Sequence, residues 1–161
     1  MVRNKINKLF IIPLFFSVVT IIIIFIFSFQ AGVISTDSSL AVTRVSARLI
    51  FYQFDSFSTE LQDEIISGMH FSIRKTAHFT IYSMLGLNLF LTAHFLIKKL
   101  RFQIISALVI SIICAAADEI NQYFIPGRDG NIFDVFIDTA GAAFGIAAGI
   151  IVLSVIYNRL N

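Results

Sequence analysis

Long apolar runs alternate with short polar segments along this chain, and four of the runs are long enough to cross a membrane. We expect spans at about residues 9–29, 76–97, 102–124 and 134–157. The first is an apolar run of 21 residues, Leu9–Phe29, which at about 1.5 Å per residue matches a hydrocarbon layer of about 30 Å. Because it is longer than the apolar part of a cleaved signal peptide, we interpret it as a retained span.

The segment 30–75 between the first two spans is polar to amphipathic. Within it we expect one helix at about Leu40–Gln53, after a serine-rich capping segment. We expect a second at about Thr59–Ser67, between the cap residue Ser58 and Gly68. Neither helix is apolar enough to cross, so we expect an interfacial pair that lies on the bilayer or caps the bundle.

The composition of the chain excludes an ordinary soluble domain. Hydrophobic residues make up 57% of the 161 residues and charged residues only 14%, whereas about 25% charged residues is usual in soluble proteins. A core of this length cannot bury so much apolar surface. We therefore predict an all-α integral membrane protein, with residues 1–161 in one domain. Its expected architecture is a four-transmembrane-helix bundle with an extracytoplasmic amphipathic helical loop between spans 1 and 2.

The distribution of charge predicts the orientation in the membrane. The N-terminus, the 98–101 loop and the C-terminus together hold seven Lys and Arg residues and no acidic residue. The other side holds all ten acidic residues. Because basic loops stay in the cytoplasm, we expect a multi-pass plasma-membrane protein with both termini cytoplasmic. The 30–75 loop and the polar site described next would then face outward.

Polar residues gather where three spans reach the predicted outer surface. On the second span, Arg74, His78 and Tyr82 recur at four-residue intervals and therefore share one face of the helix. The third span ends in the segment 118–122, DEINQ, which places two carboxylates and a glutamine near its end. We expect these helix ends to surround one site.

The fourth span begins with Asp134 and Asp138, which are also four residues apart. Their stripe continues through Gly141, Gly145 and Gly149, and small residues at this spacing let another helix approach closely. We therefore expect the stripe that carries the two aspartates to face the interior of the bundle. Carboxylates within a span are costly, so they need a partner, a water-filled cavity or a substrate.

The residue types in this site point to chemistry on a phosphate. Histidine transfers protons near neutral pH, and arginine binds phosphate oxygens bidentately. The predicted helix N-termini near Arg74 and Asn131 add a favourable potential for an anion. A site at the level of the headgroups favours a lipid-borne phosphate as substrate. The candidate catalytic residues are His78, Asp118, Glu119, Asp134 and Asp138, and the candidate substrate-binding residues are Arg74, Lys75, Tyr82, Gln122 and Arg128.

Other interpretations of these residues stay open. The carboxylates could hold Mg²⁺ or Ca²⁺, but no full ligand set can be counted, and no metal or other cofactor is assigned. The basic residues could be interfacial anchors, Arg128 could pair with Glu119, and Asp134 could be only a helix cap. We expect Asp129, in its glycine-flanked turn, to be solvated. These roles explain Glu119 and Asp138 poorly, because both lie within spans.

Three ordered motifs run through the last three spans. They are Arg74-Lys75-x-Ala77-His78-Phe79-x-x-Tyr82-x-x-Leu85-Gly86, Asp118-Glu119-x-x-Gln122-x-Phe124-x-Pro126-Gly127-Arg128 and Asp134-x-x-x-Asp138-Thr139-x-Gly141. Together with the Ser28-Phe29-Gln30 end of the first span, they resemble the VanZ-like family of bacterial membrane proteins. The resemblance implies an active site for phosphate-linked lipid headgroups, in which His78 and the carboxylates act as acid, base or nucleophile, and Arg74 and Arg128 hold phosphate. The family is named for a protein associated with teicoplanin resistance, which implies a role in the cell envelope.

Three functions compete at this stage. The first is an enzyme, a lipid-phosphate headgroup hydrolase or transferase that acts on a phospholipid or polyprenyl phosphate at the outer face. The second is a non-catalytic binder of lipid-linked wall precursors or of a lipophilic antibiotic, and the third is a small transporter. The expected partners are membrane lipids or a lipid-linked wall precursor and not nucleic acid, and the oligomeric state is left open.

Overall fold

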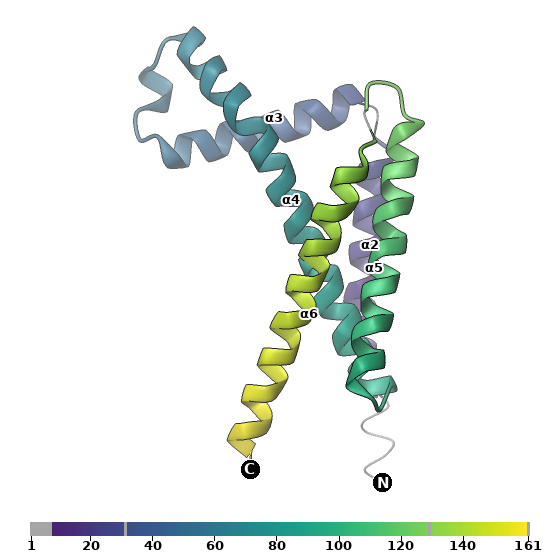
Figure 1. The fold of residues 1–161 in the computed structure, drawn as a ribbon. Helices are drawn as coiled ribbons and strands as arrows, with labels where there is room; N and C mark the ends of the chain where they lie inside the picture. The colour runs from purple at the N-terminus through teal and green to yellow at the C-terminus, as the bar shows by residue number, and fades with distance from the viewer. Residues whose placement is uncertain (1–7, 31, 129, 161) are drawn as a thin grey trace.

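The computed structural model describes residues 8–30, 32–128 and 130–160, and every regular element in these ranges is a helix. Four helices are long and apolar enough to cross a membrane, which confirms the predicted fold class. They are α2 (Ile11–Ser28), α4 (Thr59–Leu96), α5 (Leu100–Tyr123) and α6 (Ile132–Leu160), and they form an elongated bundle (Figure 1).

The centre of the bundle is α4, which packs most extensively along α6 and also contacts α2 and α5. Two glycines of α6 allow α4 and α6 to pack closely. A Cβ atom at Gly141 would collide with the carbonyl of Phe79 on α4, and one at Gly145 would collide with the carbonyl of Ser83. The glycine stripe therefore faces the interior, as the four-residue spacing predicts.

Apolar side chains fill the bundle and also cover its outside. The buried cluster is formed by Ile24, Tyr82, Leu85, Leu89, Phe90, Ala107, Ala115 and Ile146. On the outer sides of the spans, Phe15, Ile113 and Phe144 are each 61% exposed. Exposed apolar surface of this extent on every span is what a helix bundle presents to lipid.

The helix α4 continues through Gly68, so the predictions of a separate helix that ends at Ser67 and of a helix N-terminus near Arg74 were wrong. Ser58 caps its start as expected, because its Oγ accepts a hydrogen bond from the backbone N–H of Leu61 at 3.4 Å. Among the described glycines only Gly127 has a positive φ, so Gly68 does not adopt a helix-ending conformation. With 38 residues, α4 is about 57 Å long and extends well beyond one hydrocarbon layer.

The N-terminal part of α4 belongs to a helical hairpin that projects sideways from the bundle (Figure 1). We call this hairpin the arm; it comprises α3 (Gly32–Ile50), the 3-10 helix η1 (Phe54–Ser56) and α4 up to Met69. A small core of Ala47, Phe54 and Ile66 holds it together. A helix was predicted here, but α3 begins at Gly32 and not near Leu40.

The early start of α3 places polar residues inside the helix. The residues before Leu40 read as capping material, but the structure includes them in α3. The hydroxyl of Ser39 donates to the carbonyl of Thr36 at 2.9 Å, and that of Thr43 donates to the carbonyl of Ser39 at 2.8 Å. Serine and threonine in a helix commonly make such bonds to the preceding turn.

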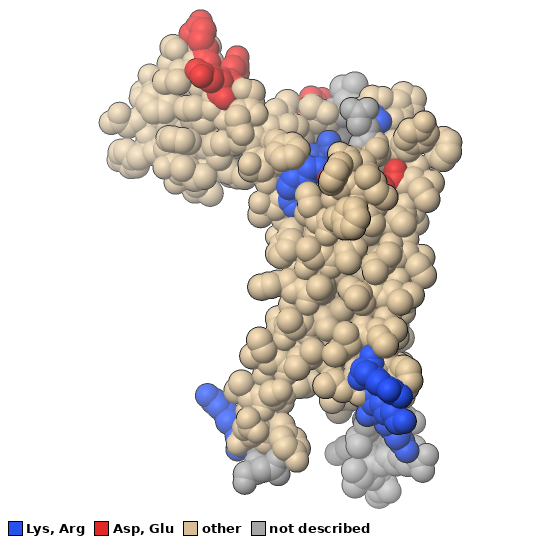
Figure 2. Space-filling view, viewed as in Figure 1, with Lys and Arg blue, Asp and Glu red and all other residues tan. Residues whose placement is uncertain are grey.

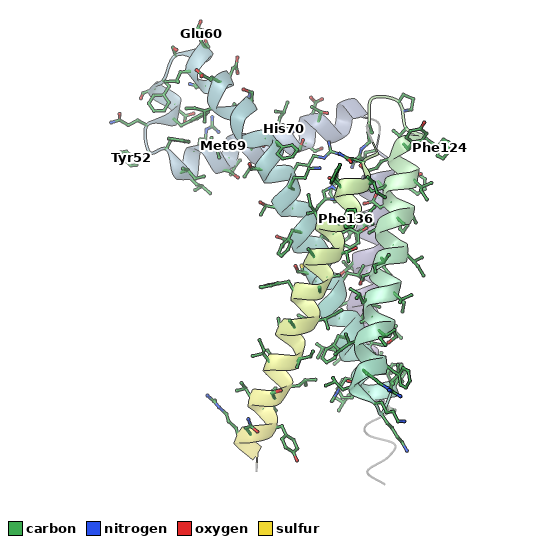
Figure 3. The ribbon with its side chains drawn as sticks, in the orientation of Figure 1. Tyr52, Glu60, Met69, His70, Phe124 and Phe136 are labelled. Atoms are coloured by element: carbon green, nitrogen blue, oxygen red, sulfur yellow. The ribbon has the colours of Figure 1, made fainter. Side chains whose placement is uncertain are left out.

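The arm has two chemically different surfaces. Val42, Val45 and Leu49 on α3 are between 55% and 83% exposed, and Tyr52, just after its end, is 98% exposed. One apolar side of the arm is therefore largely uncovered. In Figure 3, Tyr52 lies on the lower side of the arm, the side toward which the spans extend, and Glu60 lies on its upper side. Acidic side chains gather at the tip of the arm in Figure 2. This polarity fits a hairpin that rests on the surface of a bilayer.

Candidate functional site

A cavity of about 280 Å³ lies at the end of the bundle from which the arm projects, between α2, α3, α4 and α5. Most of its wall is apolar, and polar residues from all four helices interrupt it. The lining residues are Ile24, Phe27, Ser28, Gln30, Ser38, Ser39, Val42, Ile73, Arg74, Ala77, His78, Ile81, Tyr82, Asp118 and Gln122.

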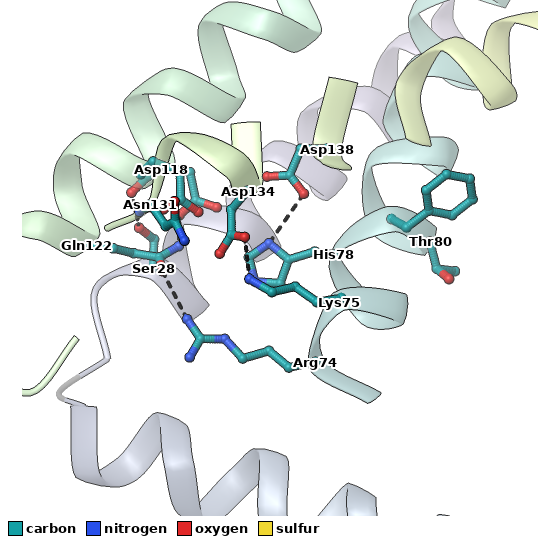
Figure 4. Close-up of polar contacts among 12 residues, drawn as sticks. Ser28, Arg74, Lys75, His78, Thr80, Asp118, Gln122, Asn131, Asp134 and Asp138 are labelled. Atoms are coloured by element: carbon teal, nitrogen blue, oxygen red, sulfur yellow. Dashed lines mark hydrogen bonds and ion pairs between the residues drawn. The ribbon is translucent and has the colours of Figure 1, made fainter. Parts of the chain in front are cut away.

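One face of α4 supplies the cationic side of the cavity. Arg74, His78 and Tyr82 all line it, as their four-residue spacing predicts. The guanidinium of Arg74 donates one long hydrogen bond, from Nη2 to Oε1 of Gln122 at 3.4 Å (Figure 4). Tyr82 is fully buried, and its hydroxyl has no hydrogen-bond partner among the described residues. Arg74 thus lines the cavity, and most of its donors have no partner among the described residues.

The last turns of α5 place two carboxylates beside this face. Asp118 is 3% exposed, and its Oδ1 accepts a hydrogen bond from Nε2 of Gln122 at 2.9 Å. Glu119 is 6% exposed, and its Oε2 accepts a hydrogen bond from the backbone N–H of Asn131 at 2.8 Å. One oxygen of each carboxylate is therefore fixed by a neighbouring amide group.

The first turns of α6 contribute two aspartates that pair with α4. Asp134 forms a short ion pair with Nζ of Lys75. Asp138 is completely buried, and its Oδ1 lies 3.3 Å from Nδ1 of His78 (Figure 4). The start of α6 is capped by Asn131, whose Oδ1 accepts a hydrogen bond from the backbone N–H of Phe133 at 3.0 Å. Asp134 is therefore more than a helix cap.

The turn between α5 and α6 positions Arg128 away from the cavity wall. Gly127 has φ of 78°, and the N–H of Arg128 bonds to the carbonyl of Ile125 at 3.2 Å, which confirms the predicted turn. The Arg128 guanidinium donates from Nη1 to the carbonyls of Phe27 at 2.6 Å and Ser28 at 3.1 Å. It thus caps the C-terminal end of α2 and forms no ion pair with a described carboxylate. Burial, with the nearby charge of Arg74, lowers the pKa of Arg128.

Three helices bring a histidine and three carboxylates together in the bundle. One potential ligand atom from each of His78, Asp118, Glu119 and Asp138 lies within 4.8 Å of the others. Groups this close either share protons or bind a common cation. Of the other predicted site residues, Lys75 is engaged by Asp134, and Arg128 holds α2 in place. Asp129 lies outside the described residues.

The sequence did not predict that the ends of α2 and α3 belong to the site. Ser28 lines the cavity, accepts a hydrogen bond from Nδ2 of Asn121 at 2.8 Å, and donates to the carbonyl of Asp118 at 3.4 Å. Ser38 and Ser39 on α3 line the same cavity. A polar cluster directly after the first span was the available signal, but its residues were interpreted as helix caps.

The fold and the site define a class of protein: a four-span helical membrane protein with a buried polar cluster and an amphiphilic cavity at one end. The VanZ/LLP1 family matches this chain over residues 12–154. Because the match covers nearly the whole chain, the protein belongs to the VanZ/LLP1 family. No curated protein and no solved structure gave a significant match.

Proposed function

We propose that this protein binds the phosphate of a lipid headgroup in the cavity and catalyses its hydrolysis or transfer at the outer face of the plasma membrane. The observation that carries the proposal is the combination of an apolar wall with an arginine at its polar end. Ile24, Phe27 and Ile81 line the wall, and Arg74 lines the same cavity. An amphiphile with a phosphate headgroup matches both parts.

Arg74 is the residue best suited to hold the phosphate. Its single hydrogen bond within the described ranges goes to the neutral amide of Gln122, at the long distance of 3.4 Å. A phosphate would offer stronger, charge-assisted and bidentate bonds, typically of about 2.8 Å. Lys75 is less suited, because Asp134 already binds its ammonium group.

The pairing of His78 with Asp138 supports acid–base chemistry. Because Nδ1 of His78 faces Asp138 at 3.3 Å, Nε2 is the nitrogen left for proton exchange with water or substrate. In a hydrolysis, this nitrogen would take the proton of the water that attacks phosphorus, and the lipid alcohol or phosphate would leave with the electrons of the broken P–O bond. Asp138 would stabilise the resulting imidazolium, as a carboxylate does in hydrolase triads.

The proposed orientation places both termini in the cytoplasm. Lys98, Lys99 and Arg101 lie where α4 passes into α5, and Arg159 lies in the last turn of α6, which is the end of the bundle opposite the site. Figure 2 shows basic side chains at that end. A Lys99→Cys variant and a Tyr123→Cys variant, each made with Cys114→Ser, test this arrangement. A membrane-impermeant thiol reagent applied outside intact cells should label only Tyr123→Cys. Labelling of only Lys99→Cys would show that the protein has the opposite orientation.

The experiment that tests catalysis uses purified protein in vesicles that contain phospholipid and a polyprenyl diphosphate. Release of inorganic phosphate or of a phosphorylated headgroup is measured for wild type and for His78→Ala. General acid–base catalysis contributes about 10²- to 10⁴-fold, so His78→Ala should lose at least a hundredfold in rate. His94→Ala is the matched control, because His94 lies on the same helix at its far end. Equal turnover in wild type and His78→Ala would refute the catalytic role.

A non-catalytic binder is the second candidate, and the apolar cavity wall favours it equally. A lipid-linked wall precursor or a lipophilic antibiotic would use the same wall and the same arginine. If wild type retains bound lipid but releases no product, while Arg74→Gln loses the lipid, binding without catalysis is the function. Teicoplanin sensitivity of cells that express each variant would then show whether the bound amphiphile is the antibiotic.

A further inference from the structure

The histidine and the three carboxylates next to the cavity have the make-up of a metal-binding site. One potential ligand atom from each of His78, Asp118, Glu119 and Asp138 lies within 4.8 Å of the other three. Ligands on opposite sides of an ion are about 4.0–4.4 Å apart when each bond is about 2.0–2.2 Å. Atoms this close can surround one ion after small movements of their side chains.

We propose that His78, Asp118, Glu119 and Asp138 together bind one divalent metal ion of the first transition row. The ligands come from α4, α5 and α6, so the ion would join three spans of the bundle. His78 and Asp118 also line the cavity, so a bound ion would be accessible from the cavity on that side. This access leaves a coordination position for water or for an oxygen of a phosphate. In the metal-bound protein, His78 and Asp138 would act as ligands, and the ion would replace Nε2 of His78 as the group that activates water.

An independent observation for this site is the set of buried oxygens without a hydrogen-bond partner. Asp138 is 0% exposed, and neither of its carboxylate oxygens accepts a hydrogen bond from a described residue. The nearest cationic group is His78, at 3.3 Å and outside hydrogen-bond geometry. Oε1 of Glu119 is likewise buried and without a donor. Buried acceptors of this kind are rare unless an ion or water satisfies them.

Two of the carboxylates are held in the way that metal ligands usually are. Gln122 donates to Oδ1 of Asp118 at 2.9 Å, and the backbone N–H of Asn131 donates to Oε2 of Glu119 at 2.8 Å. Each bond fixes one carboxylate and leaves its other oxygen available. Hydrogen bonds from outer residues orient ligands in known metal sites in the same manner.

The charge of the site also favours a cation. Asp118, Glu119 and Asp138 bring three carboxylates into the bundle, and His78 is the only described residue that forms an ion pair with any of them. Buried carboxylates require compensation by a partner. Lys75 does not supply it, because its ion pair is with Asp134. A divalent ion would neutralise most of this charge.

The ligand types define the class of metal. Carboxylate oxygens suit Mg²⁺, Ca²⁺ and Mn²⁺, whereas an imidazole nitrogen suits Zn²⁺, Fe²⁺ and neighbouring ions. One imidazole with three carboxylates therefore favours a first-row transition metal over Mg²⁺ or Ca²⁺. Mn²⁺ is a suitable probe, because the electron paramagnetic resonance signal of its hydrated form decreases when the ion binds to protein.

The test measures metal binding without lipid, so its result is independent of the proposed function. Purified full-length protein in detergent is stripped with a chelator and titrated with Mn²⁺. We expect about one high-affinity site per chain and a higher thermal transition temperature with Mn²⁺ present. Asp138→Asn and Glu119→Gln preserve side-chain shape, and each should weaken binding by at least tenfold. Zn²⁺ should compete with Mn²⁺ more strongly than Mg²⁺ does.

Asp63→Asn, on the exposed part of the arm, is the matched control. It makes the same chemical change away from the four ligands and reports binding by surface acids. It should bind Mn²⁺ with wild-type affinity. If Asp138→Asn does not fold, His78→Gln and Glu119→Gln carry the test alone. Wild-type affinity in Glu119→Gln and His78→Gln, or no saturable site in wild type, would overturn the proposal.

Discussion

Replacing Gly145 by alanine should destabilise the bundle, because the added methyl group has no space. A Cβ at this position would collide with the carbonyl oxygen of Ser83 on α4. A backbone atom cannot rotate away as a side chain can, so α4 and α6 must separate. Overpacking of this kind costs about 1–3 kcal/mol. In a chain of 161 residues, each kcal/mol of lost stability lowers the transition temperature by about 2–4 °C. The variant should therefore melt about 2–12 °C below wild type.

Gly68→Ala is the matched control, with the same chemical change in another helix position. An added Cβ at Gly68 meets no atom within 4 Å. Alanine in a helix interior is more stable than glycine by about 0.5–1 kcal/mol, so this variant should melt slightly higher than wild type. The two substitutions therefore predict shifts of opposite sign.

A thiol-reactive fluorescent dye provides the assay in detergent. Cys114 is the sole cysteine of the chain and is partly buried in α5. Heating exposes its thiol as the helices separate, and the midpoint of the fluorescence rise gives the transition temperature. Transition temperatures of Gly145→Ala at or above that of Gly68→Ala would refute the close packing of α4 against α6.

Two further predictions concern the ion pair and the arm. Lys75→Met leaves Asp134 without its partner, and loss of one partner of a buried pair costs about 3–5 kcal/mol, so this variant should melt well below wild type. Lys75→Met combined with Asp134→Asn should recover most of the lost stability. A double variant as unstable as the single one would contradict the pairing. Tyr52→Cys and Glu60→Cys, each in a Cys114→Ser background, can be labelled with an environment-sensitive fluorescent dye. In vesicles, the emission spectrum of the dye at position 52 should be blue-shifted relative to that at position 60. Identical water-like spectra at both positions would show that the arm does not rest on lipid.

The sequence predicted the parts of the fold that depend on regular spacing. Apolar runs locate the four spans, and the intervals of three and four residues from Asp138 through Gly141 to Gly145 predict the buried side of α6. Both depend on helix periodicity alone. The continuation of α4 through Gly68 was not predictable in this way. Glycine favours the end of a helix but is tolerated inside one, and long-range packing in the arm decided the outcome.

The candidate site was predicted in part for the same reason. Arg74, His78 and Asp118 lie on helix faces whose direction follows from spacing, and all three line the cavity. Arg128 sits on a turn, where spacing does not define a direction, and the structure directs it to the carbonyls at the end of α2. The contribution of Ser39 depends on how α3 lies beside the end of the bundle, which no local pattern encodes.

Native mass spectrometry of the purified protein tests the central claim most directly. The account predicts that wild type carries a bound lipid that contains phosphate, and that Arg74→Gln loses most of it. Arg48→Gln on the exposed surface of the arm, where Arg48 pairs with Asp55 at 2.9 Å, should retain it. A wild-type adduct without phosphorus, or the same phosphate lipid at equal occupancy in Arg74→Gln, would contradict the assignment of the cavity to a phosphate-linked lipid.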